Sequence, residues 1–154
     1  MRKKSTEELN KLLGSKKPDQ LGEYLKSSRE FLINDKKAFY YYMKDIFDEK
    51  RIKLKDVYIY AGVSESYGEK ILSMTKHTRN RDLILRFCLA GHCNWQETNR
   101  ALKLYGMNEL YAKDARDACI IVAINNRIFN LDKIDEMLSG HGLKKITREE
   151  QKDT

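Results

Sequence analysis

The feature that most constrains the fold of this chain is a glycine-centred turn between two short helical patterns, within residues 54–72. Gly62 stands where the first helix must end, and glycine adopts the left-handed conformation of such a turn at little cost. Ser64 follows as an N-cap, because its hydroxyl can accept a hydrogen bond from an amide of the next helix. The segment therefore predicts two helices joined by a three-residue turn, the second over about residues 64–73.

Apolar positions around the turn indicate how these helices would pack. Val57 and Ala61 lie four residues apart on the first helix, and Ile71 lies eight residues beyond Val63. These side chains predict a shared core beneath the turn. The outward face of the second helix would then carry Glu65, Ser66, Tyr67, Glu69 and Lys70.

The turn Ala61-Gly62-Val63-Ser64, the late Ile71 and the basic loop that follows resemble the lambda-repressor-like (Xre-type) helix-turn-helix family, over roughly residues 36–105. The resemblance implies a sequence-specific DNA-binding transcription regulator of a bacterial cell. In this family the second helix, the recognition helix, meets base edges in the DNA groove. One such helix reads only a few base pairs, so a homodimer is an expected arrangement.

Two departures from the family pattern keep other functions open. Gly68 occupies a core-facing position where the family usually places a branched apolar residue, at a cost of up to about 1 kcal/mol relative to alanine. Glu65 and Glu69 put negative charge on the face that would approach phosphates, although a glutamate can accept a hydrogen bond from cytosine. The alternatives are a protein-interaction adaptor or an antitoxin-like regulator with a protein partner, built on the same helices.

The loop at residues 76–81 is basic and contains no acid. In this class of fold it lies beside the DNA backbone, where Lys76, Arg79 and Arg81 would neutralise phosphates. The alternative is a solvated loop in which Arg81 pairs with Asp82 or caps a helix. The candidate DNA-binding residues are therefore Ser64, Glu65, Ser66, Tyr67, Glu69, Lys70, Lys76, Thr78, Arg79 and Arg81.

An internal repeat follows the predicted turn. Arg81-Asp82 begins a unit of two helices that ends at Gly106, and Arg116-Asp117 begins a similar unit that ends at Gly142. Repeated hairpins normally bury their apolar faces on one another, although two ordinary hairpins can be similar by chance. The helix over residues 118–124 is apolar almost all round, which predicts a central position.

The fold class predicted from these patterns is all-α. The expected organisation is a basic helical extension over residues 1–35, a helix-turn-helix domain over 36–106, a helical hairpin over 107–143 packed on it, and a polar tail over 144–154. Residues 1–44 hold eleven Lys and Arg against six Asp and Glu, which accounts for most of the net charge of +7.

Several classes of function find no support in the sequence. No apolar run approaches the length of a transmembrane helix, and the N-terminus does not resemble a signal peptide, so we expect a cytoplasmic protein without membrane contact. Cys88, Cys93 and Cys119 lack paired spacing, which favours buried structural thiols over a disulfide or a metal site. No catalytic motif is present, so neither an enzyme nor a cofactor is predicted.

Overall fold

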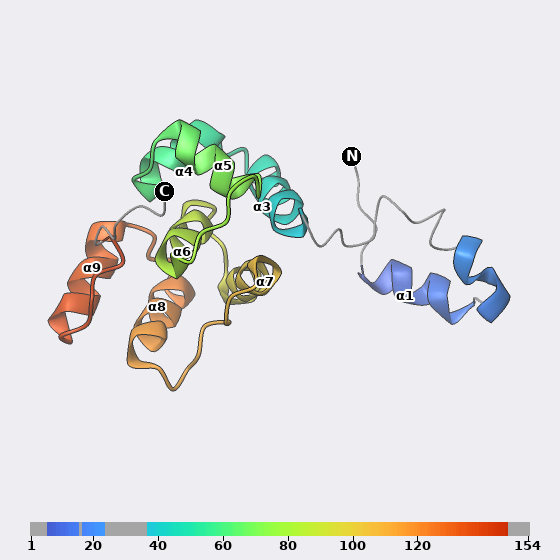
Figure 1. Cartoon of the computed structure of the whole chain (residues 1–154). Helices are drawn as coiled ribbons and strands as arrows, with labels where there is room; N and C mark the ends of the chain where they lie inside the picture. The colour runs from blue at the N-terminus through green and yellow to red at the C-terminus, as the bar shows by residue number, and fades with distance from the viewer. Residues whose placement is uncertain (1–5, 16, 24–36, 148–154) are drawn as a thin grey trace. The chain divides into compact units, whose positions relative to one another are not determined.

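The computed structural model describes residues 6–15, 17–23 and 37–147, and these residues form helices and connecting turns without a strand (Figure 1). The all-α prediction is therefore confirmed. The chain divides into two compact units, Met1–Asp35 and Lys36–Thr154. The first contains α1 (Thr6–Gly14) and the short 3-10 helix η1 (Pro18–Gln20). The sequence Ser5-Thr6-Glu7-Glu8 is a capping-box pattern that predicts a helix start at Ser5, which lies outside the described residues.

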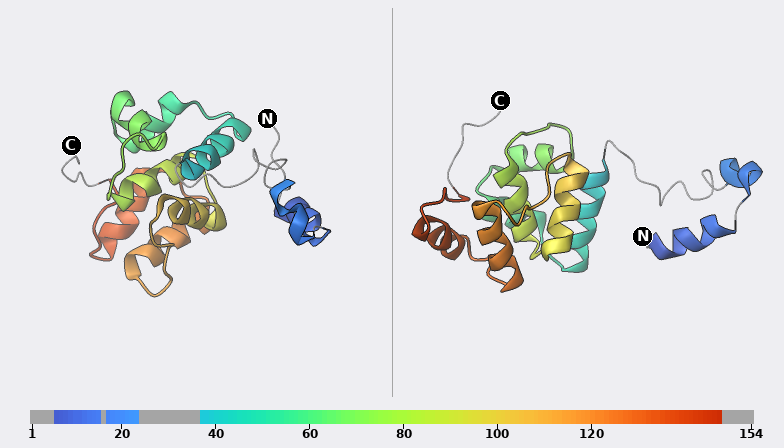
Figure 2. Two further views of the ribbon diagram at one scale, coloured as in Figure 1. Left: turned by 45° about the vertical axis from the view of Figure 1, so that its right-hand side comes forward. Right: turned by 90° about the horizontal axis from the view of Figure 1, so that it is seen from below.

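The second unit is a bundle of short helices around one core. Its elements are α3 (Ala38–Glu49), α4 (Leu54–Ala61), α5 (Glu65–Leu72), α6 (Arg81–Ala90), α7 (Trp95–Tyr105), α8 (Ala115–Asn125) and α9 (Leu131–Gly140). Helices α3 and α7 lie side by side, and α4 packs on α6 (Figures 1 and 2). Helix α9 packs on α8 at the far end of the bundle.

The most deeply buried helix of this unit is α6, whereas the residues 118–124 that were predicted to be central are buried only in part. All residues of α6 after its first are buried. Helix α8 buries Ile120 and Ile124 against its neighbours but leaves Val122 51% exposed. Apolar residues such as Val122 also lie on the exposed side of α8. An apolar sequence on all sides of a helix therefore does not by itself show that the helix is buried on all sides.

A buried arginine ties α6 to two distant segments. Arg86 donates from Nε to the carbonyl of Ala61, at the end of α4, and from Nη1 to the carbonyl of Ile146, at 2.9 and 2.7 Å. Ile146 is fully buried, and its amide donates to the Asp135 carboxylate at 2.7 Å. Within the segment expected to be a polar tail, Ile146 is thus packed into the core, whereas Lys144, Lys145 and Thr147 are exposed. Residues 148–154 lie outside the described residues.

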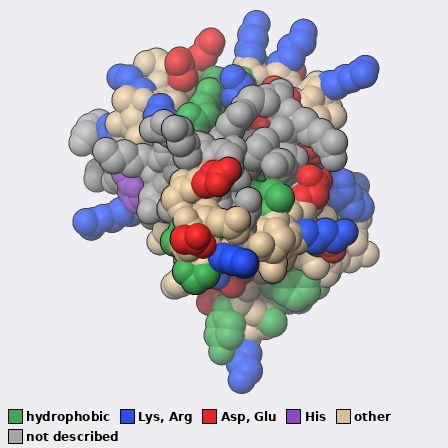
Figure 3. Space-filling view, turned by 90° about the vertical axis from the view of Figure 1, so that its right-hand side faces the viewer, with side chains coloured by type: hydrophobic (Ala, Val, Ile, Leu, Met, Phe, Trp, Pro, Cys, Tyr) green, Lys and Arg blue, Asp and Glu red, His purple; other side chains and the backbone are tan. Residues whose placement is uncertain are grey.

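On the face drawn in Figure 3, Lys and Arg side chains stand among Asp and Glu side chains.

Within residues 6–15, 17–23 and 37–147, none of the helices combines the length and the hydropathy needed to cross a bilayer.

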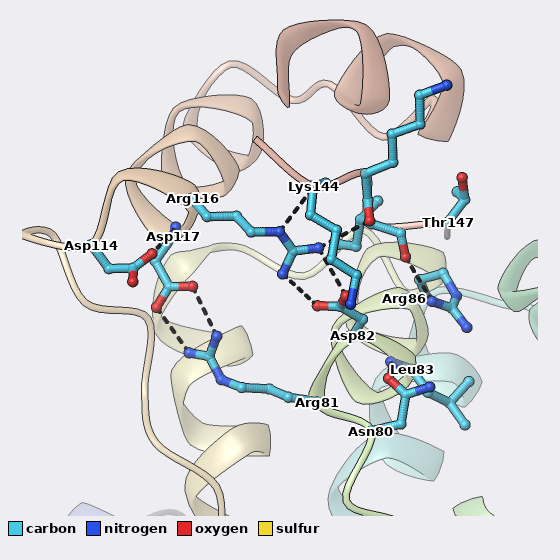
Figure 4. A network of polar contacts seen from close by, with 12 residues as sticks. Asn80, Arg81, Asp82, Leu83, Arg86, Asp114, Arg116, Asp117, Lys144 and Thr147 are labelled. Carbon is cyan, nitrogen blue, oxygen red and sulfur yellow. Dashed lines mark hydrogen bonds and ion pairs between the residues drawn. The ribbon is translucent and has the colours of Figure 1, made fainter. Parts of the chain in front are cut away.

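The two predicted repeat units interlock through their first turns (Figure 4). Arg81 of α6 holds Asp117 of α8 through two hydrogen bonds of 2.8 and 3.0 Å, and Arg116 of α8 holds Asp82 of α6 through two of 2.8 Å. Each arginine of the repeated Arg-Asp pair therefore binds the aspartate of the other pair. Planar guanidinium groups favour this two-point geometry with carboxylates.

Equivalent positions elsewhere in the two hairpins make equivalent bonds. Arg81 donates to the carbonyls of residues 108 and 109, and Arg116 donates to those of residues 144 and 145. The Asn99 side chain accepts from the amide of Leu110, as the Asp135 side chain does from that of Ile146. The hairpins α6–α7 and α8–α9 are thus structural repeats.

The ion pairs between the repeats are largely screened from water. The side chains of Asp82 and Asp117 are 10% and 8% exposed, and those of Arg116 and Arg81 are 21% and 27% exposed. The hydrogen bonds to Asp82 raise the pKa of Arg116 above its ordinary value. Removing one partner would leave a nearly buried carboxylate without its counter-ion.

We predict that Arg116→Gln lowers the free energy of unfolding by about 2–4 kcal/mol, below the upper range for fully buried pairs because the guanidinium is partly exposed. Urea denaturation monitored by circular dichroism measures the change. The matched control is Arg100→Gln on the exposed side of α7, which should stay within about 0.5 kcal/mol of the parent protein. Equal losses in the two variants would contradict this role for Arg116.

Candidate functional site

The predicted turn between two helices is present at residues 62–64. Gly62 has a φ of +73°, and the amide of Val63 donates to the carbonyl of Tyr58 at 3.2 Å. The hydroxyl of Ser64 accepts from the amide of Tyr67 at 3.1 Å, which confirms Ser64 as the N-cap of α5. Left-handed glycine ends α4 abruptly, and the serine cap starts α5 in a new direction.

The predicted core beneath the turn is confirmed in its main members. Val57, Ala61 and Ile71 are buried, whereas Val63 is only partly buried. Because α4 also packs on α6, α5 is held against a rigid body along one side. Its other side is left open.

The structure explains why a glycine occupies position 68 in the middle of α5. It lies on the buried side of α5, and a Cβ atom placed there would come within 2.4 Å of Cδ1 of Tyr58. The aromatic ring of Tyr58, on α4, therefore occupies the space that a side chain at Gly68 would need. An unusual mid-helix glycine is the signal that could have indicated this close approach.

The exposed arc of α5 has two edges of opposite charge. Glu65, Ser66, Glu69 and Lys70 are exposed, and Tyr67 is half-buried. At 100° per residue, Glu65 and Glu69 lie along one edge, Lys70 and Tyr67 along the other, and Ser66 between them. The ammonium group of Lys76 lies 5.4 Å from the centre of the Tyr67 ring and extends the basic edge.

The acidic edge of α5 borders a surface hollow of about 190 Å³ between α3, α4 and α5, here called the α5 hollow. Burial raises the pKa of Tyr58, and the negative charges of Glu69 and Glu65 raise it further. The phenol therefore stays protonated at neutral pH. The hollow is lined by Tyr40, Leu54, Lys55, Tyr58, Glu65, Glu69, Leu72 and Ser73.

Two of the candidate DNA-binding residues do not face outward. Thr78 is buried, and its amide donates to the hydroxyl of Tyr105 at 2.9 Å. Arg81 is held by Asp117 and by backbone carbonyls, and the alternative pairing of Arg81 with Asp82 is also absent because Asp82 binds Arg116. Arg79 is exposed and Lys76 is partly exposed, so the basic loop keeps these two cations at its surface.

The cysteines lie apart from this surface. Cys88 and Cys93 are buried free thiols, and Cys119 is partly buried. A hydrogen bond with Cys93 and burial raise the pKa of Cys88 well above its ordinary value. Among the described residues, no group of three or more His, Cys, Asp or Glu side chains is arranged to hold a metal ion.

Comparison with known proteins does not place the chain in a family. No protein-family model matches it, and searches of curated proteins and of solved structures find no match either. A function therefore has to be inferred from the chemistry of α5 and its surroundings.

We predict that Gly68→Ala destabilises the protein by up to about 2 kcal/mol, because a clash of about 1–3 kcal/mol with Tyr58 outweighs the roughly 1 kcal/mol gain in helix propensity. In a Tyr58→Ala background the ring is gone, and the same substitution should stabilise the protein by up to about 1 kcal/mol. Urea denaturation of the four proteins gives the coupling between the two positions. The same effect of Gly68→Ala in both backgrounds would contradict the close approach.

Proposed function

We propose that the second unit binds duplex DNA through α5 and acts as a sequence-specific transcription regulator of the lambda-repressor-like type. The observation that carries the proposal is the pairing of α4 and α5 about Gly62, which leaves a polar arc of α5 exposed. A helix held in this way can enter the major groove while the preceding helix crosses the backbone. Such a protein would act in the bacterial cytoplasm, where the DNA lies.

The two edges of α5 suggest separate roles on the DNA. Ser66, exposed in the middle of the arc, is the candidate for base contact, and Lys70, exposed on the basic edge, is the candidate for contact with the walls of the groove. Lys76 and Arg79 would join Lys70 in neutralising phosphates. Tyr67, held under Lys76, would pack along the groove wall. Specific recognition of a useful length of DNA would require two copies of the chain.

A protein-interaction adaptor is the second candidate, and an antitoxin-like regulator would combine both activities. The observation in favour of these alternatives is the acidic edge formed by Glu65 and Glu69, which would repel phosphates. Arg81 is also paired with Asp117, so the loop has fewer cations that could contact the DNA backbone than the sequence predicts. On DNA, the two glutamates would instead accept from cytosine amino groups.

We predict that Lys70→Ala, Lys76→Ala and Arg79→Ala together reduce the dependence of duplex affinity on salt by about two to three units of slope, since each phosphate contact contributes roughly 0.9. Fluorescence anisotropy with labelled random duplex at several salt concentrations measures the slope. The affinity for every duplex should fall, because phosphate contacts carry no sequence information.

The matched control is Lys103→Ala, Lys113→Ala and Lys133→Ala, which removes the same charge from exposed positions outside α5 and its loop. This variant should keep nearly the whole slope. An equal reduction in both triple variants would reject the assigned contacts. A wild-type protein without salt-dependent duplex binding would reject DNA binding and favour the adaptor.

A further inference from the structure

Helix α8 differs from the other described helices in the composition of its exposed side. Its exposed residues are Ala115, Val122 and Asn125, and Ala118 and Cys119 are partly exposed beside them. Spacings of three and four residues place these five on one side of the helix. Among the described helices that have exposed residues, every other one exposes at least one charged side chain. The charge-free surface formed by these five residues is here called the α8 face.

The internal repeat indicates that another helix covers a surface of this kind. When the two Arg-Asp pairs are aligned, Ala118, Cys119 and Val122 of α8 correspond to Leu83, Ile84 and Phe87 of α6. The three residues of α6 are at most 1% exposed, because the other helices of the unit cover them. The outer unit of a repeat normally has a polar outer side, but the α8 face has kept an apolar surface without a cover among the described residues.

We propose that the α8 face pairs with the α8 face of a second copy of this chain, with the two helices antiparallel about a two-fold axis. In such a contact each surface meets itself, so a charged surface would meet like charges. A face without charges avoids this repulsion. The same face offers little to DNA, because it has no cation for the phosphates.

The charges at the two ends of α8 favour the antiparallel arrangement. Just before the helix, Glu109 and Asp114 outnumber Lys113, and just after it stands Arg127. Antiparallel pairing brings the acidic end of each helix to the basic end of the other, which is the complementarity that selects a partner and its orientation. The same arrangement opposes the two helix dipoles. A second copy therefore supplies both the apolar surface and the matching ends.

The pairing also fixes which positions meet. If Ala115 of one copy lies opposite Val122 of the other, the two-fold axis passes between Ala118 and Cys119. The small side chains there permit the close approach of helix axes, at about 8–10 Å, that is usual for packed helices. The two Cys119 thiols would then lie near each other across the axis.

The inference is independent of the proposed DNA binding. Helix α8 lies on the other side of α6 from α4 and α5 (Figures 1 and 2). Pairing through α8 therefore leaves the exposed arc of α5 open, and it can be measured without DNA.

The test is sedimentation velocity of the full chain over a range of concentrations, without DNA. We expect a dimer with a dissociation constant on the order of 100 μM, because one helix face covers less than the roughly 800 Å² per partner of a standard interface. Val122→Lys should weaken the dimer by at least about tenfold, because it places two ammonium groups in the contact. In dilute solution this variant should keep the unfolding temperature of the parent, since Val122 is 51% exposed in the single chain.

The matched control is Ile59→Lys, which adds the same charge at an exposed apolar position of α4. Ile59 is 67% exposed and lies outside the α8 face. This variant should change the dissociation constant by less than about twofold, because the substitution is distant from the contact.

A second substitution tests the orientation. Ala115→Glu alone should weaken the dimer by about tenfold, because two carboxylates enter the contact. Together with Val122→Lys in one chain, it should restore the dissociation constant to within about threefold of the parent value, because antiparallel copies place each new carboxylate opposite a new ammonium group. A parallel pair would place like charges together and would not be restored.

Cys119 gives an independent measurement of the contact. It is partly buried, whereas Cys88 and Cys93 are buried. A short bismaleimide should therefore join two copies through Cys119 at concentrations where the dimer forms, and it should not join copies of Cys119→Ser.

Four outcomes would overturn the proposal. A chain that stays monomeric at about ten times the expected dissociation constant would show that the α8 face does not pair with itself. Equal weakening by Val122→Lys and Ile59→Lys would show only non-specific association. Failure of the double variant to recover would reject the antiparallel arrangement. Slow maleimide labelling of Cys119 in the dilute monomer would show that a segment of the same chain covers the face.

Discussion

The buried guanidinium of Arg86 is the interaction on which the arrangement of the second unit depends. A charge removed from water must find hydrogen-bond partners, and Arg86 reaches the carbonyls of Ala61 and Ile146. The first carbonyl ends α4 at the turn, and the second belongs to the segment after α9. One side chain of the central helix therefore holds both the turn that orients α5 and the last packed segment of the chain.

The reciprocal pairs of Arg81 with Asp117 and of Arg116 with Asp82 connect the central helix α6 to the second hairpin. They also give Arg81 of the basic loop a structural role, because its guanidinium group binds the buried carboxylate of Asp117. The loop keeps Lys76 and Arg79 at the surface. The surface beside α5 is consequently less basic than the sequence suggests.

The exposed arc of α5 is divided into a basic and an acidic edge. Lys70 and Lys76 form one edge, and Glu65 and Glu69 form the other, beside the hollow that Tyr58 lines. In the proposed DNA complex, a duplex would meet the basic edge, away from Glu65 and Glu69.

The sequence by itself determined the local structure: Gly62 as the left-handed end of α4, Ser64 as the cap of α5, and the apolar positions of the shared core. These follow from backbone conformation and side-chain spacing within a few residues, which a sequence displays directly. It also indicated the repeat through its Arg-Asp pairs. The cross-pairing of those residues, the burial of Thr78 and Ile146, and the position of the Tyr58 ring against Gly68 were decided only by the tertiary structure. Each is a contact between different elements of the structure, and its partner is determined by how the helices pack.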